Sequence, residues 1–449
     1  MVPVDWLTVA LLILLFYGLV AWYVKKKRIR EDLIAFYGPV MAIKTSRVGF
    51  FDRFRPYAAF FRAYGTIGIA MVVVVSFAMT ALVIFAFQSE VKNPPAPTGV
   101  FAPPNWFVIP GVNQFIPLTL PVLLGLFITV AIHEMGHGIL CRVEGILVKS
   151  MGVLIFVIPI GFFVEPDEEE LERAPPVAKS RMYGAGIANN LVLGFACFGI
   201  LILLLGMVTP VPGPIIYMVQ EGSPAHNASI PLGSVIRALD GEQVSTPEGV
   251  SQILSGTKPG DTVGLTVLPA EVVRDLPATG PEPPGTTYNI SLGSAPDRIY
   301  GYMGINYYDT ARIAGVLNGL GSPTGLLLLS ILPVDILENK WPPLHVILMY
   351  TPDEAFFRVP FPFFWAVVHF FFWCGWFNFM VGTFNALPMV PFDGGFIFKE
   401  GVTGLFRRIG KPQLADRAVL AVSLVILALI ILIVTIPSIA KLLTMVGPG

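Results

Sequence analysis

One segment restricts the fold of this chain more than any other: an uncharged run over residues 115–132 that leads directly into His133-Glu134-Met135-Gly136-His137. A run of this length and apolarity is typical of a helix that crosses a bilayer. Helical spacing puts both histidines on one face, where both imidazoles can reach one metal ion. The intervening Glu134 can act as general base on a metal-bound water. Because a metal and a water are costly inside a membrane segment, the pattern predicts hydrolysis within or beside the bilayer.

The composition is that of a polytopic membrane protein: 54% of the residues are apolar, 13% are charged, and the mean hydropathy is +0.72. The formal net charge of −1 does not indicate a nucleic-acid partner. The cysteines Cys141, Cys197 and Cys374 lie in apolar stretches and form no CxxC pair. We therefore expect neither a disulfide framework nor a cysteine-type zinc site.

Six apolar stretches have the length of membrane spans, and we expect an α-helical fold of about six spans. They cover residues 6–24, 64–87, 115–141, 182–207, 362–387 and 419–439. The loop over residues 25–62 carries ten Lys and Arg residues against three acids, so the positive-inside rule predicts that it is cytoplasmic. The N-terminus is then expected outside the membrane, and the HExxH end of the third span towards the cytoplasm.

Two further apolar segments do not fit the alternation of charged loops. Residues 146–164 are rich in β-branched residues and contain Lys149 and Pro159, which favours strands lying at the membrane. Residues 315–336 are interrupted by glycine and proline, and a seventh span would upset the charge pattern. We expect an interfacial or re-entrant segment there.

Residues 209–310 change in character and predict an inserted α+β domain. Short apolar strands alternate with turn signals, and Ser245-Thr246-Pro247-Glu248 is typical of a helix start. The order of these elements resembles a circularly permuted PDZ domain of the kind found in membrane proteases. The charge pattern places this PDZ-like domain outside the cytoplasm.

HExxH supplies two ligands, and a catalytic zinc usually takes three from the protein. His226 and His345 are expected on the outer side, and His369 near the outer end of its span. Asp393 follows the fifth span at its cytoplasmic end. Because both spans run inward, His133, His137 and Asp393 are expected on one side of the membrane.

Three motifs in this order resemble the site-2 protease family of intramembrane zinc metalloproteases. They are HExxH at His133, GxxxN from Gly186 to Asn190, and NxxPxxxxDG from Asn385 to Gly394. The resemblance implies one zinc per chain, bound by His133, His137 and Asp393, with Glu134 as the catalytic base. It implies that Asn190 shapes the site or holds the oxyanion, and that Asn385 and Pro388 position the substrate. An asparagine in a span is equally explained by interhelical hydrogen bonding.

The resemblance also implies regulated intramembrane proteolysis of membrane-anchored substrates that another protease has already trimmed. The chain would comprise two N-terminal spans with a basic loop (1–113), a first metalloprotease part (114–208), the PDZ-like domain (209–310), the interfacial or re-entrant segment (311–361), and a second metalloprotease part with a final span (362–449). A membrane metal transporter and an inactive PDZ-type protein that binds membrane partners are the alternatives. Few other charges in the spans and the intact Glu134 argue against them.

Overall fold

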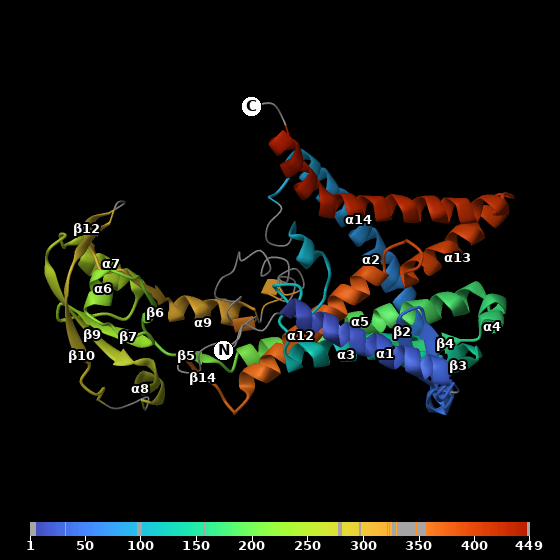
Figure 1. Cartoon of the computed structure of the whole chain (residues 1–449), viewed down its shortest axis with the longest axis horizontal. Coiled ribbons are helices and arrows are strands. Elements are labelled where there is room, and N and C mark those ends of the chain that lie inside the picture. The colour runs from blue at the N-terminus through green and yellow to red at the C-terminus, as the bar shows by residue number, and fades with distance from the viewer. Residues whose placement is uncertain are drawn as a thin grey trace. The chain divides into compact units, whose positions relative to one another are not determined.

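The structure, a computed structural model, describes residues 6–31, 33–96, 101–156, 158–276, 281–295, 298–320 and 356–446, with isolated positions between 322 and 348. The chain divides into two units, residues 1–197 with 373–449 and residues 198–372 (Figure 1). Long helices make up most of the first unit, and an antiparallel sheet organises the second. Two long helices, α5 and α12, continue from one unit into the other.

Long apolar helices account for the membrane character of the chain. The helical elements of the first unit are α1 (Trp6–Lys27), η1 (Gly49–Tyr57), α2 (Ala58–Lys92), η3 (Pro103–Trp106), α3 (Leu120–Glu144), α4 (Glu168–Arg173), α5 (Pro176–Leu205), α12 (Phe364–Asn385), α13 (Asp393–Arg408), η5 (Pro412–Leu414) and α14 (Ala415–Val446). Within the described residues, five helical stretches are long and apolar enough to cross a membrane: Gly49–Lys92, Leu120–Glu144, Pro176–Leu205, Phe364–Asn385 and Pro412–Leu442. They match five of the six expected spans. The first expected span lies within α1, and the count of six stays a prediction.

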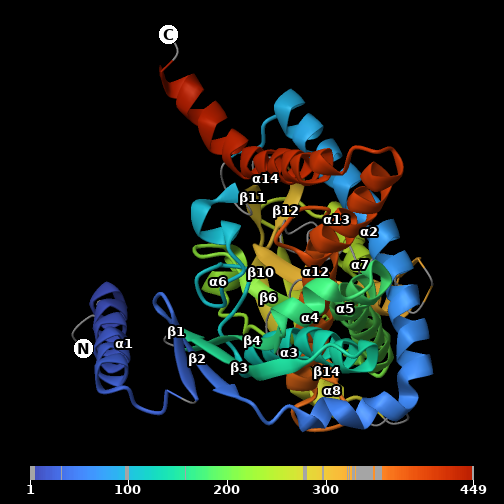
Figure 2. The ribbon, with the colours of Figure 1, turned by 90° about the vertical axis from the view of Figure 1, so that its right-hand side faces the viewer.

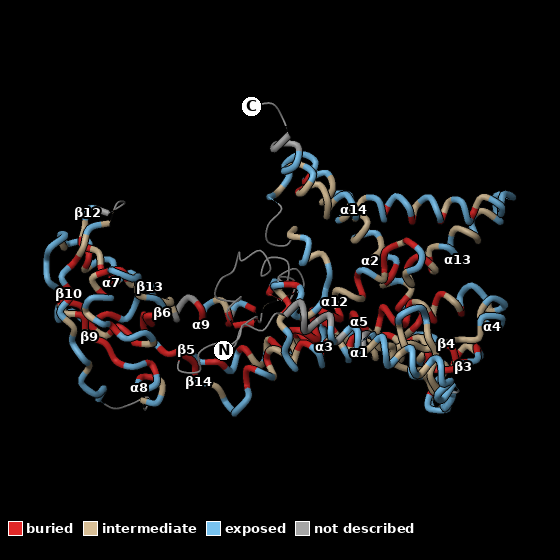
Figure 3. Tube along the Cα trace, in the orientation of Figure 1, coloured by how far each residue is buried: buried red, intermediate tan, exposed pale blue. Residues whose placement is uncertain are grey.

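Burial separates inner helices from outer ones. In the most apolar windows of α2 and α14 only 11% and 17% of the residues are buried, whereas the corresponding value in α12 is 56%. Figure 3 shows the same contrast along the trace of α14, which is largely exposed or intermediate. Exposed apolar helices of this length need an apolar surrounding, which lipid supplies. Helices α3, α5 and α12 therefore form the interior of the helical unit.

Small residues bring the inner helices into close contact. A Cβ atom on Gly136 of α3 would lie 2.8 Å from the Ala185 backbone of α5. A Cβ atom on Gly125 of α3 would lie 2.9 Å from the Cys374 nitrogen of α12. Glycine at such contacts lets the backbones of membrane helices approach without a side chain between them. The packing fixes α3, the helix with the HExxH sequence, against both neighbours.

A four-stranded antiparallel sheet flanks α3 (Figure 2). Its order is β1 (Ile34–Tyr37), β2 (Val40–Thr45), β3 (Val148–Phe156) and β4 (Ile158–Pro166). The strands expected over residues 146–164 are confirmed as β3 and β4. The β1–β2 hairpin was not predicted, because residues 25–62 were interpreted only as a basic loop. Its pairing partner in β3 lies more than a hundred residues further along the chain.

Residues 393–408, which follow the fifth expected span, form helix α13. Asp393 stands in its first turn, and Arg407 and Arg408 stand in its last. These charges complement the helix dipole, which favours acids at the N-terminus and bases at the C-terminus. A helix over these residues was not predicted from the sequence, where the charges were used only to assign the side of the membrane.

The second unit contains a sheet of order β10-β9-β7-β6-β13, with β8 paired to β7. Its elements are β5 (Thr209–Pro210), β6 (Ile215–Val219), α6 (Pro224–Asn227), β7 (Ser234–Leu239), β8 (Glu242–Gln243), α7 (Pro247–Ser255), β9 (Thr262–Pro269), α8 (Ala270–Asp275), β10 (Thr286–Ser291), β11 (Gly293–Ala295), β12 (Arg298–Tyr302), β13 (Ile305–Tyr308), α9 (Thr310–Gly319) and β14 (Phe357–Arg358). The expected helix start is confirmed: the Thr246 hydroxyl caps α7 by accepting a hydrogen bond from the Gly249 N–H. Most of the segment 315–336 lies outside the described residues.

Candidate metal centre

Helix α3 places the two histidines of HExxH one turn apart. The helix starts after Thr119 with a proline in its first turn, and it ends at Gly145, whose φ of 85° gives a left-handed C-cap. The His133 and His137 rings lie 4.7 Å apart between centroids. Both imidazoles therefore point from the same face of α3, as the spacing predicted.

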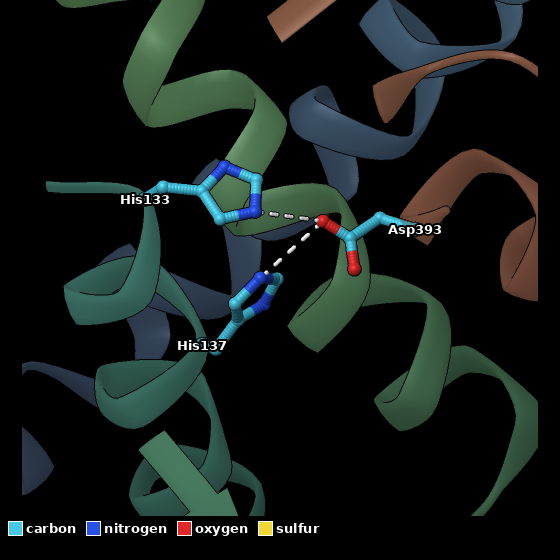
Figure 4. Close-up of side chains that lie close together, drawn as sticks. All are labelled: His133, His137 and Asp393. Carbon is cyan, nitrogen blue, oxygen red and sulfur yellow. Dashed lines mark ion pairs between the residues drawn. The ribbon is translucent and has the colours of Figure 1, made fainter. Parts of the chain in front are cut away.

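Asp393 meets both histidines from the first turn of α13 (Figure 4). Its Oδ2 atom lies 3.0 Å from His133 Nε2 and 3.3 Å from His137 Nε2. All three side chains are nearly buried, with exposed fractions of 9%, 12% and 13%. Burial alone would raise the pKa of Asp393, but its contacts with the two histidines outweigh burial and hold that pKa below its usual range.

The donor set and the spacing fit a zinc ion. Ligand atoms about 2.0–2.2 Å from a tetrahedral zinc lie roughly 3.3 Å from one another. The distances from Asp393 Oδ2 to the two imidazole nitrogens are close to that value. The same oxygen is buried and makes no well-directed hydrogen bond to any described residue. Three ligand atoms that converge without hydrogen bonding to one another are arranged as they would be around a shared cation.

The Nδ1 atoms of the two histidines have different surroundings. The His137 Nδ1 atom lies 2.9 Å from the Met182 carbonyl oxygen of α5. Such a contact fixes the tautomer and leaves Nε2 free to bind a metal. His133 Nδ1 is buried and has no partner among the described residues. The Met182 contact was not predicted, because a backbone carbonyl leaves no signature in a sequence.

Glu134 points to the sheet beside α3. Its Oε2 atom accepts a hydrogen bond of 2.9 Å from the backbone N–H of Val164 in β4. Glu134 also lines a cavity of about 920 Å³ formed by α3, η1 and strands β2 to β4. The Glu134 carboxylate is thus held by a backbone group of β4, and it borders a cavity that can admit a ligand.

The GxxxN sequence of α5 lies directly against the two histidine rings. A Cβ atom on Gly186 would lie 2.6 Å from His137 Nε2 and 2.9 Å from His133 Cε1, so only glycine leaves room for both rings. Asn190, one turn further along, is fully buried, and neither polar atom of its side chain has a partner among the described residues. An unpartnered amide of this kind needs a ligand, a water or a substrate group to satisfy it.

Interhelical hydrogen bonds, which were one explanation for an asparagine in this span, are made by Asn189, the residue before Asn190. The Tyr64 hydroxyl of α2 donates to Asn189 Oδ1 at 2.7 Å, and Asn189 Nδ2 donates to the Ile132 carbonyl at 2.9 Å. Ile132 precedes His133 in α3. Asn189 therefore connects three helices at the turn that carries the first histidine, a role that the sequence motif did not reveal.

The remaining candidate residues lie elsewhere along α12 and the turn after it. Asn385 is the last residue of α12, and Pro388 lines a second cavity of about 510 Å³ together with residues of α2, α5 and α13. His369 lies with its Nε2 atom 3.1 Å from the Ile347 carbonyl. His345 is outside the described residues. Among the described residues, one group of three or more potential ligands meets the spacing for a metal, namely His133, His137 and Asp393.

Comparison with known proteins agrees with this site. Residues 121–430 match the model of peptidase family M50. The chain is 35% identical over 130 residues to a membrane-bound transcription factor site-2 protease homolog of Arabidopsis thaliana, covering 28% of this chain and 25% of the relative. It is 27% identical over 198 residues to a Brucella suis protein whose name assigns it to the zinc metalloproteases, covering 35% and 52%. An uncharacterised protein of Methanocaldococcus jannaschii is 21% identical over 276 residues, covering 61% and 55%. The matches thus span between about a quarter and about half of each relative's length.

Proposed function

This chain belongs to peptidase family M50, the site-2 protease family, and we propose that it is a membrane-embedded zinc metalloendopeptidase. It would hydrolyse peptide bonds in the transmembrane segments of membrane-anchored substrates. The observation that carries the proposal is the convergence of His133, His137 and Asp393 on one point, with Glu134 on the same helix. One zinc per chain satisfies this ligand set.

The chain's own groups divide the chemistry between them. Zinc, when bound by the three ligands, lowers the pKa of a water and polarises the scissile carbonyl. Glu134 would act as general base towards the attacking water and would pass the proton to the leaving amine. The Val164 N–H holds the Glu134 carboxylate in place. The unpartnered Asn190 amide is suited to donate to the carbonyl oxygen as negative charge develops on it.

A substrate helix must unwind before its peptide bonds can be attacked, because its carbonyls are occupied by its own hydrogen bonds. Strand β4 offers the unwound segment a partner. Within the described part of the chain, β4 pairs with β3 along one edge, and no described strand pairs with its other edge. An extended substrate can add to such an edge by β-augmentation. Asn385 and Pro388, in and beside the turn that leads to Asp393, would position the same segment from the other side.

The second unit would control which substrates reach the site. We propose that the sheet and helices of residues 209–310 form a PDZ-like domain outside the cytoplasm, across the membrane from the metal. A domain in that place acts as a size filter or binds a newly exposed C-terminus. Preferred substrates would then be those that another protease has already trimmed.

The decisive experiment compares the wild-type chain with Glu134→Gln in vesicles that contain a transmembrane peptide. We expect the wild type to cleave the peptide and a zinc chelator to stop it. Glu134→Gln should lower the rate by roughly 10²–10⁴, the usual contribution of a general base. Its zinc content and its peptide binding should stay unchanged. Equal cleavage by both proteins would refute the assignment, and zinc-dependent transport without cleavage would favour a metal transporter.

A further inference from the structure

The cavity beside Glu134 combines an apolar wall with a cluster of cations. Phe51, Met151 and Phe162 line its apolar part, and Glu134 lines the side formed by α3. Its volume of about 920 Å³ lies in the range of ordinary ligand sites. A short extended peptide segment with apolar side chains fits a space of this size and character.

Arg30, Lys44 and Arg47 line the same cavity from β2 and the segments that flank β1 and β2. Glu134 is the only carboxylate among the described lining residues. That carboxylate already accepts the Val164 N–H, and the proposed chemistry requires it to stay available to water. Lys44 and Arg47 therefore give the cavity more positive charge than its own acid neutralises.

Lys44 and Arg47 differ from the neighbouring cation Arg142 in having no ion-pair partner among the described residues. Neither side chain makes an ion pair with any described residue. Arg142, close by at the end of α3, instead lies 2.7 Å from Asp52. Lys44 is half-buried, so its charge is less screened by water than that of a fully exposed lysine. Two unpaired cations on the wall of a cavity favour a ligand that brings its own negative charge.

The register of the sheet aligns Lys44 with the two other strands that line the cavity. Lys44 of β2 lies opposite Gly152 of β3, which lies opposite Phe163 of β4. A Cβ atom on Gly152 would lie 2.8 Å from the Phe163 ring. The same atom would clash with the Ile43 carbonyl oxygen and lie 2.9 Å from Lys44 Cα, so glycine lets β2 and the Phe163 ring pack closely against β3.

We propose that this cavity binds the part of the substrate that adjoins the scissile bond, and that Lys44 and Arg47 select segments carrying aspartate or glutamate there. The inference rests on the proposed protease function, which it deepens by naming a substrate class. The preferred substrate has an apolar membrane segment followed within a few residues by acidic side chains. Because the cations share the cavity with Glu134, we assign the negative charge to the substrate chain and not to lipid headgroups.

The test uses two transmembrane peptides in neutral phosphatidylcholine vesicles. One carries a pair of Asp or Glu residues after its apolar segment, and the other carries Asn or Gln at the same positions. A series in which the pair moves one residue at a time covers the unknown cleavage position. We expect the wild type to favour the acidic peptide in kcat/KM by roughly threefold per ion pair, and we expect added salt to reduce that preference.

Substitution of the two cations identifies their role. Lys44→Gln with Arg47→Gln should abolish the preference and leave cleavage of the amide peptide unchanged. Lys44→Glu with Arg47→Glu should favour a lysine-bearing peptide. Lys149→Gln is the matched control, since Lys149 lies in the same sheet, pairs with Asp167 and does not line the cavity. This control should keep the wild-type preference.

Other outcomes separate this inference from the protease assignment. Equal kcat/KM for the acidic and amide peptides in the wild type would overturn the inference and leave the protease function intact. An equal loss of cleavage of both peptides in the double variant, seen only with phosphatidylglycerol vesicles, would show that the cations bind lipid and would also overturn it. Absence of all cleavage by the wild type would instead overturn the protease function. In that case the affinities of the Glu134→Gln protein for the acidic and the amide peptide test the inference by themselves. Equal affinities would refute it.

Discussion

Gly186 of α5 faces His137 of α3 so closely that a Cβ atom at position 186 would lie 2.6 Å from His137 Nε2. The same atom would lie 2.9 Å from His133 Cε1. The first residue of the GxxxN sequence thus makes room for two of the proposed metal ligands. The requirement for glycine is steric, since no special backbone conformation is involved.

Gly186→Ala should therefore displace an imidazole and lower zinc occupancy and cleavage together. Metal analysis of the purified protein, alongside a cleavage assay, measures both quantities. Gly199→Ala is the matched control on the same helix, because no atom lies within 4 Å of its added Cβ. A fully zinc-loaded and active Gly186→Ala protein would show that the histidines do not hold the metal in the position described.

Asp393→Ala should remove the third ligand and leave a site of two histidines. We expect the zinc content to fall well below one per chain and cleavage to be lost with it. Asp416→Ala is the control, because Asp416 lies in the first turn of α14 and is largely exposed. Unchanged zinc content and proteolysis in Asp393→Ala would exclude Asp393 as a ligand.

Tyr64→Phe should weaken the connection between α2 and α5. The substitution removes the donor to Asn189 Oδ1 and leaves that oxygen without its partner. A lost hydrogen bond of this kind costs about 1 kcal/mol. The Tm in detergent should fall by a few degrees, roughly 2–4 °C. Tyr57→Phe, at an exposed tyrosine, should leave the Tm unchanged.

Cysteine labelling with an impermeant reagent tests the expected topology. The native cysteines are all buried, so an introduced one reports alone. Glu242→Cys in β8 should react from the outer side of the membrane, and Arg408→Cys at the end of α13 should react from the cytoplasmic side. Reaction of Glu242→Cys from the cytoplasm alone would place residues 209–310 on the side opposite to the one proposed.

Replacement of residues 212–309 by a short linker tests the size filter. The shortened protein should cleave substrates that keep large external domains, whereas the wild type should cleave only trimmed ones. The comparison needs one substrate prepared in both forms and assayed with both proteins. Equal rates on both forms by the wild type would refute the filter without affecting the metal site.

The sequence predicted those features that depend on local pattern. Apolar runs located the long helices, and the four-residue spacing placed His133 and His137 on one face. Asp393 was identified because its span and α3 were expected to end on the same side. The structure brings these residues together and places Asp393 in the first turn of α13, a helix that the sequence did not predict.

Features that depend on contacts between distant parts of the chain could not be predicted. The pairing of β2 with β3 joins Met41 to Ile155, and neither segment carries a signal for its partner. The division of roles between Asn189 and Asn190 is set by which side of α5 each faces, and two adjacent asparagines do not reveal that. Backbone groups such as the Met182 carbonyl are common to every residue, so no residue type points to them.

The hydrogen bond from Val164 to Glu134 uses a main-chain donor, which has a consequence for mutational robustness. Every amino acid except proline supplies the same backbone N–H. The contact to the glutamate therefore does not depend on the side chain at position 164, although that side chain lines the cavity and packs against the apolar cluster around Phe51. Val164→Ile should therefore keep the orientation of Glu134, whereas Val164→Pro removes the donor and should lower the cleavage rate even if the protein still binds zinc.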